Sequence, residues 1–350
     1  MNITINNRII GPGRPTYIVA EMSANHGKDF KQAIRIIEAA KDVGADAIKI
    51  QTYTPDTLTI DCSNDYFRIS GTLWDGKTLY DLYGEAYTPW EWQAELKDAA
   101  ESMGMDFFST PFDFTAVDFL EELDVPVYKV ASFEIVDLPL LRKIASTGKP
   151  IIISVGMASL GEIEEAVQTI KKSGNDQIAL LKCTSAYPSP PEHMNLNTIS
   201  HLGATFSMPT GLSDHTLGTV VPVAAVALGA CIIEKHFTID RSRPGPDSAF
   251  SLEPDEFKAM VKDIRTVEKA LGNIQYGVGE SEAGSQVFRR SLFVVRDMKA
   301  GEPFTQENVR SIRPGYGMHT RYFEEIKSMS AAVDIERGTP LSWNLFAPRL

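Results

Sequence analysis

Cysteine is scarce in this chain of 350 residues, and its few copies are poorly placed for cross-linking. Their number is odd, they are widely spaced, and no CxxC pair occurs: the three are Cys62, Cys183 and Cys231. These features exclude a disulfide framework and a zinc–thiolate site, and they predict a protein of the reducing cytoplasm. Cys183, which follows Lys182, is interpreted as a packed strand residue rather than a reactive thiol.

Positive charge and long hydrophobic runs are also in short supply. The chain carries 34 Lys and Arg against 46 Asp and Glu, which gives a net charge of −12. This balance argues against a nucleic-acid partner and an anionic membrane surface, but not against a small anionic substrate in a local basic pocket. The longest apolar run, residues 220–231, contains Pro222 and Gly229 and is too short to span a bilayer. The first residues, MNITINNRII, lack the basic start and apolar core of a signal peptide.

The sequence does contain a regular alternation of β-branched apolar runs and helical stretches up to about residue 270. The apolar runs are expected as strands at residues 17–22, 47–53, 106–112, 127–132, 151–156, 178–185, 210–215 and 231–237. Helices are expected near residues 29–43, 89–103, 114–123, 138–146, 159–172, 195–204, 218–229 and 254–271. Apolar strands separated by helices are typical of a parallel sheet. This repetition predicts an α/β fold, a closed (β/α)8 TIM barrel.

The composition and the residue pattern of the sequence change after residue 272. Residues 273–288 are rich in glycine and poor in apolar side chains, so we expect a linker there. Residues 289–350 have short β-type runs and few helical periods, which predicts a small β-rich domain that packs on a barrel, its own or a partner's. Within the barrel, residues 1–272, an aromatic-rich loop at residues 54–88 is expected at the C-terminal face, where barrels bind substrates.

Polar residues stand at the carboxyl ends of nearly all the predicted strands, where a stable barrel core does not need them. Lys49 and Lys129 lie inside β-branched runs, and burying an unpaired ammonium group is costly. The two lysines indicate an anionic ligand or a Schiff-base nucleophile, unless each pairs with a buried carboxylate such as Glu21 or Glu134. The sequence has no Walker motif and no GxGxxG between a strand and a helix.

His215 and His236 end the last two predicted strands, which are neighbours in a closed barrel. Two imidazoles placed in this way can converge on one divalent metal ion. Glu234 and Asp247 are close to them in sequence. With nitrogen and oxygen ligands and no thiolate, Mn²⁺, Mg²⁺ and Zn²⁺ all remain possible from the residues alone.

Taken together, these segments resemble the sialic acid synthase family, whose members condense phosphoenolpyruvate with an amino sugar. The matching segments follow in order along essentially the whole chain: AEMSANH, DAIKIQTY, FFSTPFD, YKVASFE, IIISVGMAS, LKCTSAYP, GLSDHT, IIEKHFT, GPDSAFSLEP, RRSLFVV, KAGE and IRPGYG. The resemblance implies a barrel followed by an antifreeze-like (SAF) domain. Within the family, SANH after Met22 and the loop GTLWDGKTLYDLYGEAYTPWEW resemble the branch that makes pseudaminic acid.

The resemblance also implies roles for single residues. It implies that Glu21, Glu234, Lys49 and Lys129 are catalytic, the two glutamates in proton handling and water positioning. Phosphoenolpyruvate would be held by Lys49, Thr110, Lys129, Ser132, Ser154, Ser185 and Ser213. A divalent ion, Mn²⁺ before Mg²⁺ or Co²⁺, would be held by His215 and His236. The sugar would meet Gln51, Tyr187, Asp247 and, from the SAF domain of the other subunit in a domain-swapped homodimer, Arg313.

The expected reaction joins phosphoenolpyruvate to 2,4-diacetamido-2,4,6-trideoxy-L-altrose and releases phosphate. The same chemistry on N-acetylmannosamine or on the legionaminic acid precursor is the first alternative. A more distant one is a metal-dependent or Schiff-base aldolase, with Lys129 as the Schiff-base nucleophile. A barrel without enzymatic activity is disfavoured by the polar strand ends. Ser185 and Lys182 depart from the Asn and His usual in sialic acid synthases, which leaves the polar partners of that strand open.

Overall fold

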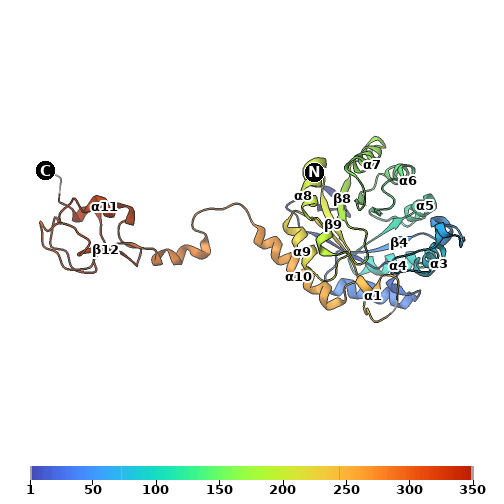
Figure 1. Ribbon diagram of the computed structural model, residues 1–350, viewed down its shortest axis with the longest axis horizontal. Helices are drawn as coiled ribbons and strands as arrows, with labels where there is room; N and C mark the ends of the chain where they lie inside the picture. Colours follow the sequence, from blue (N-terminus) through green and yellow to red (C-terminus); the bar gives the residue numbers. More distant parts are fainter. Residues whose placement is uncertain (1, 72, 244, 348–350) are drawn as a thin grey trace. The chain divides into compact units, whose positions relative to one another are not determined.

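The computed structural model describes residues 2–71, 73–243 and 245–347, and the chain forms two compact units, residues 1–272 and 273–350. The first unit is a closed barrel of parallel strands with helices around it (Figure 1). Its strands are, in barrel order, β10 (Ile232–His236), β3 (Tyr17–Glu21), β4 (Ala47–Thr52), β5 (Asp106–Pro111), β6 (Tyr128–Val130), β7 (Ile151–Ser154), β8 (Ile178–Cys183) and β9 (Thr210–Asp214). Each predicted strand range contains one of these strands, so the predicted (β/α)8 barrel is confirmed.

The helices of the barrel bury one face each against the strands. They are α1 (Phe30–Asp42), α4 (Trp90–Ser102), α5 (Phe114–Glu122), α6 (Leu138–Ala145), α7 (Leu160–Lys172), α8 (Asn197–Phe206), α9 (Val220–Ala227) and α10 (Pro254–Leu271). In α1 the buried positions Ala33, Ile36, Ile37 and Ala40 recur at the spacing of one helical face. Short 3-10 turns lie in the connections: η1 (Ser23–His26), η3 (Pro191–His193) and η4 (Ser248–Phe250).

An N-terminal hairpin closes the end of the barrel opposite the predicted site. Its strands, β1 (Ile3–Ile5) and β2 (Arg8–Ile10), pair antiparallel, and the strand–helix alternation does not predict them. The turn residues Asn6 and Asn7 have φ values of 44° and 63°, the left-handed conformation that two-residue hairpin turns require. The apolar side chains of the hairpin share a core cluster with Tyr17, the first residue of β3.

The long connection after β4, residues 54–88, is called the lid below. It contains α2 (Pro55–Leu58), η2 (Asp65–Phe67) and α3 (Leu79–Ala86). Because it leaves the carboxyl end of β4, it lies at the C-terminal face of the barrel, as predicted.

The second unit has a small apolar core of its own, which includes Leu292, Phe304 and Val309. Its regular elements are η5 (Glu280–Phe288), β11 (Ser291–Val294), β12 (Val309–Ile312), η6 (Thr320–Tyr322), α11 (Phe323–Ile326) and η7 (Trp343–Leu345). The two strands pair antiparallel. The 3-10 helix η5 falls within the segment that we expected as a linker. Across both units, no described helix combines the length and apolarity that crossing a membrane needs.

Candidate active site

The carboxyl ends of the strands converge on a small cavity of about 60 Å³, called the inner chamber below, whose charged lining residues are buried. Strand alternation explains its composition, because Lys49 and Gln51 of β4 line it while Ile48 and Ile50 pack under the helices. Every strand of the barrel contributes at least one lining residue. The chamber brings together most of the predicted site residues: Glu21, Lys49, Gln51, Thr110, Lys129, Ser132, Ser154, Tyr187, Ser213, His215, Glu234 and His236.

Lys49 is the paired lysine of the inner chamber. Its Nζ lies 2.7 Å from Glu21 Oε2 and 3.7 Å from Glu234 Oε1, and it donates to Thr110 Oγ1 at 3.3 Å. Burial alone would lower the pKa of Lys49, but the two carboxylates outweigh burial and raise it. The ammonium group is therefore charged, and the carboxylate partner that we considered as an alternative for Lys49 is present.

Lys129 differs because its hydrogen-bond partners are all neutral. Its Nζ donates to Ser154 Oγ at 2.6 Å and to the carbonyl of Val130 at 2.9 Å. The residue is 2% exposed and forms no ion pair with any carboxylate in the described part of the chain. Burial lowers the pKa of Lys129, although the nearby Glu234 carboxylate acts to raise it. An anionic ligand beside Lys129 would give its ammonium group a direct ion-pair partner.

Serine hydroxyl groups surround Gly156 next to this lysine. The Gly156 N–H donates to Ser132 Oγ at 3.1 Å. A Cβ at position 156 would lie only 2.6 Å from Ser185 Oγ and 2.8 Å from Ser132 Oγ, so a larger residue would displace both hydroxyls. Ser185 thus lies beside the inner chamber. Hydroxyl groups and an ammonium group in such a cluster suit an anion with several oxygens.

The two buried glutamates of the chamber have opposite pKa shifts. For Glu21, burial raises the pKa, and the attraction of Lys49 only partly offsets this effect. For Glu234, burial also acts to raise the pKa, but Lys129 and Lys49 together lower it. Ser213 Oγ donates to Glu234 Oε1 at 2.9 Å. One carboxyl group thus takes up a proton more readily than usual, while its neighbour stays ionised.

His215 and His236 face each other, with ring centroids 5.4 Å apart. His215 Nδ1 lies 3.0 Å from the carbonyl oxygen of Thr184, which orients the ring and leaves Nε2 for another partner. His236 Nδ1 is buried and has no hydrogen-bond partner among the described residues. Burial lowers the pKa of His236 well below its ordinary value, which keeps the imidazole in the neutral form that binds metals.

These histidines fit a divalent metal ion, although they do not form a complete ligand set. Within the described ranges, no group of three or more His, Cys, Asp or Glu residues is arranged to hold a metal ion. The buried His236 Nδ1 nevertheless has no hydrogen-bond partner among the described residues, and the oriented His215 ring lies beside it. The two rings can therefore each offer a nitrogen ligand to a metal ion. Water or substrate oxygens would have to supply the remaining ligands.

Cys183 is a buried residue of β8, in agreement with its interpretation as a packed strand residue, and it also lines the inner chamber. Its Sγ lies 3.8 Å from His215 Nδ1. Burial acts to raise the pKa of this thiol, but His215 lowers it to about 7. The alternation of β8 could have indicated this position, since Ala179 and Leu181 point into the barrel interior and Cys183 continues that series.

A second cavity of about 400 Å³, called the outer chamber below, lies between the barrel mouth and the lid. The two cavities adjoin, because they share six lining residues: Gln51, Phe112, Ala131, Phe133, Tyr187 and His236. The remaining lining residues are mostly aromatic or apolar, with a few polar groups: Ser23, Tyr53, Leu58, Ile69, Trp74, Leu79, Leu82, Tyr83, Ala86, Glu134, Pro246 and Asp247. The predicted sugar residue Asp247 is therefore in the outer chamber, whereas most of these other residues escaped the sequence analysis.

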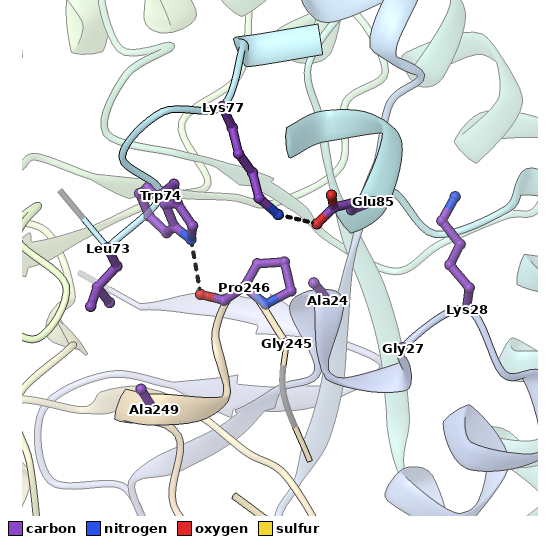
Figure 2. A pocket seen from close by; sticks show the side chains of 10 residues that line it. All are labelled: Ala24, Gly27, Lys28, Leu73, Trp74, Lys77, Glu85, Gly245, Pro246 and Ala249. Carbon is purple, nitrogen blue, oxygen red and sulfur yellow. Dashed lines mark hydrogen bonds and ion pairs between the residues drawn. The ribbon is translucent and has the colours of Figure 1, made fainter. Parts of the chain in front are cut away.

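A third, open cavity of about 500 Å³ lies beyond Trp74 and Pro246. Figure 2 shows the Trp74 indole directed at the carbonyl oxygen of Pro246, to which Nε1 donates at 3.1 Å. The same figure shows the ion pair between Lys77 and Glu85 on the lid. Trp74 and Pro246 line both this cavity and the outer chamber.

The last predicted site residue, Arg313, belongs to the second unit. It follows β12 directly and is exposed. Its guanidinium group forms no hydrogen bond or ion pair with a side chain or backbone group in the residues that the structure describes.

Comparisons with known proteins agree with this architecture. The sequence model of the NeuB family matches residues 36–276, and the model of the SAF domain matches residues 289–347. The chain is 45% identical to a pseudaminic acid synthase of Campylobacter jejuni subsp. jejuni serotype O:23/36, over 94% of this chain and 96% of the relative. It is 37% identical to the N,N'-diacetyllegionaminic acid synthase of Legionella pneumophila, over 95% of each chain.

A solved structure has the same fold. The N-acetylneuraminic acid (sialic acid) synthetase of Leptospira borgpetersenii, in complex with citrate, has a TM-score of 0.73 and 35% sequence identity to this chain. The similarity covers 81% of this chain and 95% of that chain. The resemblance to the sialic acid synthases is thereby confirmed. Because the NeuB match covers well over half of the chain, the protein belongs to the NeuB family, with a SAF domain after its barrel.

Proposed function

We propose that this protein is a pseudaminic acid synthase, which condenses phosphoenolpyruvate with 2,4-diacetamido-2,4,6-trideoxy-L-altrose to give pseudaminic acid and phosphate. The observation that carries the proposal is Lys129, a buried lysine that donates to a serine hydroxyl and a backbone carbonyl and forms no direct ion pair among the described residues, in the smaller of two adjoining chambers. Relatives named pseudaminic acid synthase, at 44–45% identity over nearly their full length, support the choice of sugar.

The inner chamber takes phosphoenolpyruvate in this proposal. Its phosphate and carboxylate groups would pair directly with Lys129, and Lys49 adds a second cation. Hydroxyl groups near the lysines would donate to the remaining oxygens: those of Thr110, Ser132, Ser154 and Ser185. Ser213 would join them by turning its hydrogen from Glu234 to the ligand. The enol carbon atoms would then lie toward the outer chamber, which adjoins the inner one.

His215 and His236 would hold the divalent ion, for which we propose Mn²⁺ before Mg²⁺ or Co²⁺. Such an ion would act as a Lewis acid on the aldehyde oxygen of the open-chain sugar. The carbonyl oxygen of Thr184 orients the His215 ring toward this task, and burial keeps His236 neutral.

Carbon–carbon bond formation uses the electrons of the enol double bond. Carbon 3 of phosphoenolpyruvate attacks the aldehyde carbon, and the aldehyde oxygen gains a proton. Water adds to carbon 2 and loses a proton, and the bond between carbon 2 and the phosphate oxygen then breaks to release phosphate. Glu21, which takes up a proton readily, and Glu234, which stays ionised, are the proposed groups for these proton transfers and for positioning water.

The outer chamber takes the sugar, which would contact Gln51, Tyr187 and Asp247. We further propose that Arg313 reaches the sugar from the SAF domain of a second copy, in a domain-swapped homodimer. Exposed apolar side chains surround the barrel mouth and would be covered by such a partner: Phe114, Phe133, Val136, Met157, Leu160, Leu217 and Val220. Replacing Arg313 by Ala should then raise the KM for the sugar and leave the KM for phosphoenolpyruvate unchanged, and Arg310→Ala is the matched control.

The three free cysteines are consistent with the reducing cytoplasm, which we propose as the compartment. The proposed reaction is tested by phosphate release from phosphoenolpyruvate with Mn²⁺ and one of two sugars, the diacetamido altrose or N-acetylmannosamine. Release with only the first sugar supports the proposal. Release with only N-acetylmannosamine keeps the chemistry and overturns the choice of sugar. No release with either sugar, from folded and metal-loaded protein, leaves the legionaminic acid precursor and then the aldolase reaction as the alternatives to measure.

A further inference from the structure

Ser23, in the turn that follows β3, has an unusual backbone conformation for a serine. Its φ of 44° is in the left-handed region, where a residue with a Cβ is disfavoured by about 1–2 kcal/mol relative to glycine. The residue is also 5% exposed, so its hydroxyl group is withdrawn from solvent. A strained serine at the edge of an active site suggests that the side chain makes contacts that glycine cannot make.

The Ser23 hydroxyl joins two residues of the proposed sugar site. Its Oγ donates to Asp247 Oδ2 at 2.5 Å and accepts from Gln51 Nε2 at 2.9 Å. Gln51 Nε2 also donates to Glu21 Oε1 at 3.0 Å. A continuous hydrogen-bond chain therefore runs from Glu21 in the inner chamber through Gln51 and Ser23 to Asp247 in the outer chamber.

The direction of these hydrogen bonds follows from the single hydrogen of the serine hydroxyl. An ionised carboxylate only accepts, so the Ser23 hydrogen goes to Asp247. Ser23 must then accept from Gln51, and this fixes the orientation of the Gln51 amide group. Both amide hydrogens of Gln51 are used, one for Ser23 and one for Glu21.

Two acceptor atoms remain for a ligand in the outer chamber. Among the described residues, no donor reaches Gln51 Oε1 or Asp247 Oδ1, and both residues line that chamber. A sugar with amide N–H and hydroxyl donors matches this pair of acceptors, whereas a group with only lone pairs does not. If the serine hydroxyl were absent, the Gln51 amide would keep only its bond to Glu21, and Asp247 Oδ2 would lose its hydroxyl donor, so both side chains would be held less firmly.

We propose that Ser23 is a specificity-determining positioning residue, which locks Gln51 and Asp247 as a pair of acceptors for the sugar's N–H and O–H donors. Ser23 need not touch the sugar, because it acts through these two side chains. This inference rests on the proposed function, since it concerns the sugar half of the same site. Buried polar groups that must be matched by a ligand discriminate strongly between related substrates.

The test uses Ser23→Gly and Ser23→Ala in the full-length, metal-loaded protein. Glycine adopts the left-handed conformation readily, so Ser23→Gly removes the hydroxyl group without harming the turn. Ser23→Ala removes the same group but keeps the backbone strain. Ser207→Gly is the matched control, because Ser207 has a φ of 54° at the end of α8, is exposed, and is outside both chambers.

Both Ser23 variants should raise the KM for the diacetamido sugar about 10-fold, the effect of one hydrogen bond to a charged group, and change the KM for phosphoenolpyruvate by less than about 2-fold. Their preference for the diacetamido sugar over N-acetylmannosamine should also weaken, while Ser207→Gly keeps wild-type kinetics. An unchanged sugar KM and preference in Ser23→Gly would overturn the proposal, as would an equal rise in both KM values. Wild-type protein that turns over neither sugar contradicts the proposed function itself, which separates the two failures.

Discussion

The inner and outer chambers adjoin, but different parts of the chain build them. The inner chamber is lined mainly by strand ends of the barrel, and its cations, carboxylates and hydroxyls are buried. The outer chamber is lined largely by the lid and by the loop around Asp247, and its walls are mostly aromatic and apolar. Strand ends have little freedom to move, so they suit chemistry that is the same for every sugar. Loops can vary in sequence without disturbing the barrel, so they suit the choice of sugar.

The largest effect is expected for the two histidines, because we propose that they take part in the chemical step and not in the choice of sugar. We expect His215→Ala and His236→Ala to lower turnover with Mn²⁺ by about 10³-fold or more, because a Lewis acid supplies several kcal/mol of stabilisation. The loss should be the same for every sugar that the wild-type protein accepts. Phosphate release, metal content and circular dichroism measure the effect, with His201→Ala on the exposed face of α8 as the control. Full activity of either variant in chelated buffer would refute the metal assignment.

The two lysines allow a comparison within the inner chamber itself. Lys49→Met leaves Glu21 and Glu234 buried without their adjacent cation, so the free energy of unfolding should fall by about 3 kcal/mol. Lys129→Met removes an ammonium group that forms no direct ion pair but that does stabilise the ionised Glu234 carboxylate, so the free energy of unfolding should fall by only about 1 kcal/mol, less than in Lys49→Met. The KM for phosphoenolpyruvate should nevertheless rise about 100-fold in Lys129→Met.

Urea unfolding of both lysine variants, together with steady-state kinetics, decides this prediction. Equal losses of stability would mean that Lys129 has a structural role like that of Lys49, and the argument for an anion site beside it would fail. A Lys129→Met variant with an unchanged KM for phosphoenolpyruvate would contradict the proposed substrate position directly.

Substitutions of Trp74 test whether the outer chamber binds the sugar. Its indole N–H donates to Pro246, and its ring packs near Tyr187 at a centroid distance of 5.8 Å. We expect Trp74→Ala to raise the sugar KM about 10-fold through lost packing and a lost hydrogen bond, and Trp74→Phe to raise it only about 3-fold. The KM for phosphoenolpyruvate should stay constant in both variants. A change in that KM would show that the two chambers are not separate in function.

The same division explains what the sequence could predict. The residues of the inner chamber could be predicted from the strand pattern, because alternate residues of a strand share a face and the carboxyl ends of parallel strands meet. Lys49, Lys129, Ser213 and His236 could all be found in this way, and the phase of β8 also contains Cys183. No contact between distant segments had to be known.

The outer chamber could not be derived so directly, because it depends on contacts between segments far apart in the chain. Ser23 meets Asp247 across 224 positions, and Trp74 meets Pro246 across 172 positions. No local pattern indicates such pairs. The N-terminal hairpin was missed for a related reason, since its strands have only three residues each and periodicity needs longer runs.

The smallest effect is expected for Glu134. This residue lines the outer chamber, but its pKa depends on the charge of Lys129 in the inner chamber. Burial raises the pKa of Glu134 from 4.5 to about 7, with Lys129 acting to lower it and Asp137 to raise it. Its Oε2 is buried and has no hydrogen-bond partner in the described ranges, and its charge acts to raise the pKa of Tyr83 and of Tyr187. Near neutral pH this carboxyl group is therefore close to half protonated.

The sign of the pH effect follows from the raised pKa. Between pH 4.5 and about 7 the folded protein binds the Glu134 proton more tightly than the unfolded chain, so the contribution of this group to stability falls as the pH rises. Glu134→Gln cannot ionise and should escape this loss. We expect the variant to match the wild-type protein at pH 5 and to exceed it by on the order of 1 kcal/mol at pH 8, measured by urea unfolding. Glu192→Gln, an exposed residue outside both chambers, is the control. A Glu134→Gln curve parallel to the wild-type curve would mean that water or a closed lid already compensates this carboxylate, and the outer chamber would then be less apolar than its walls indicate.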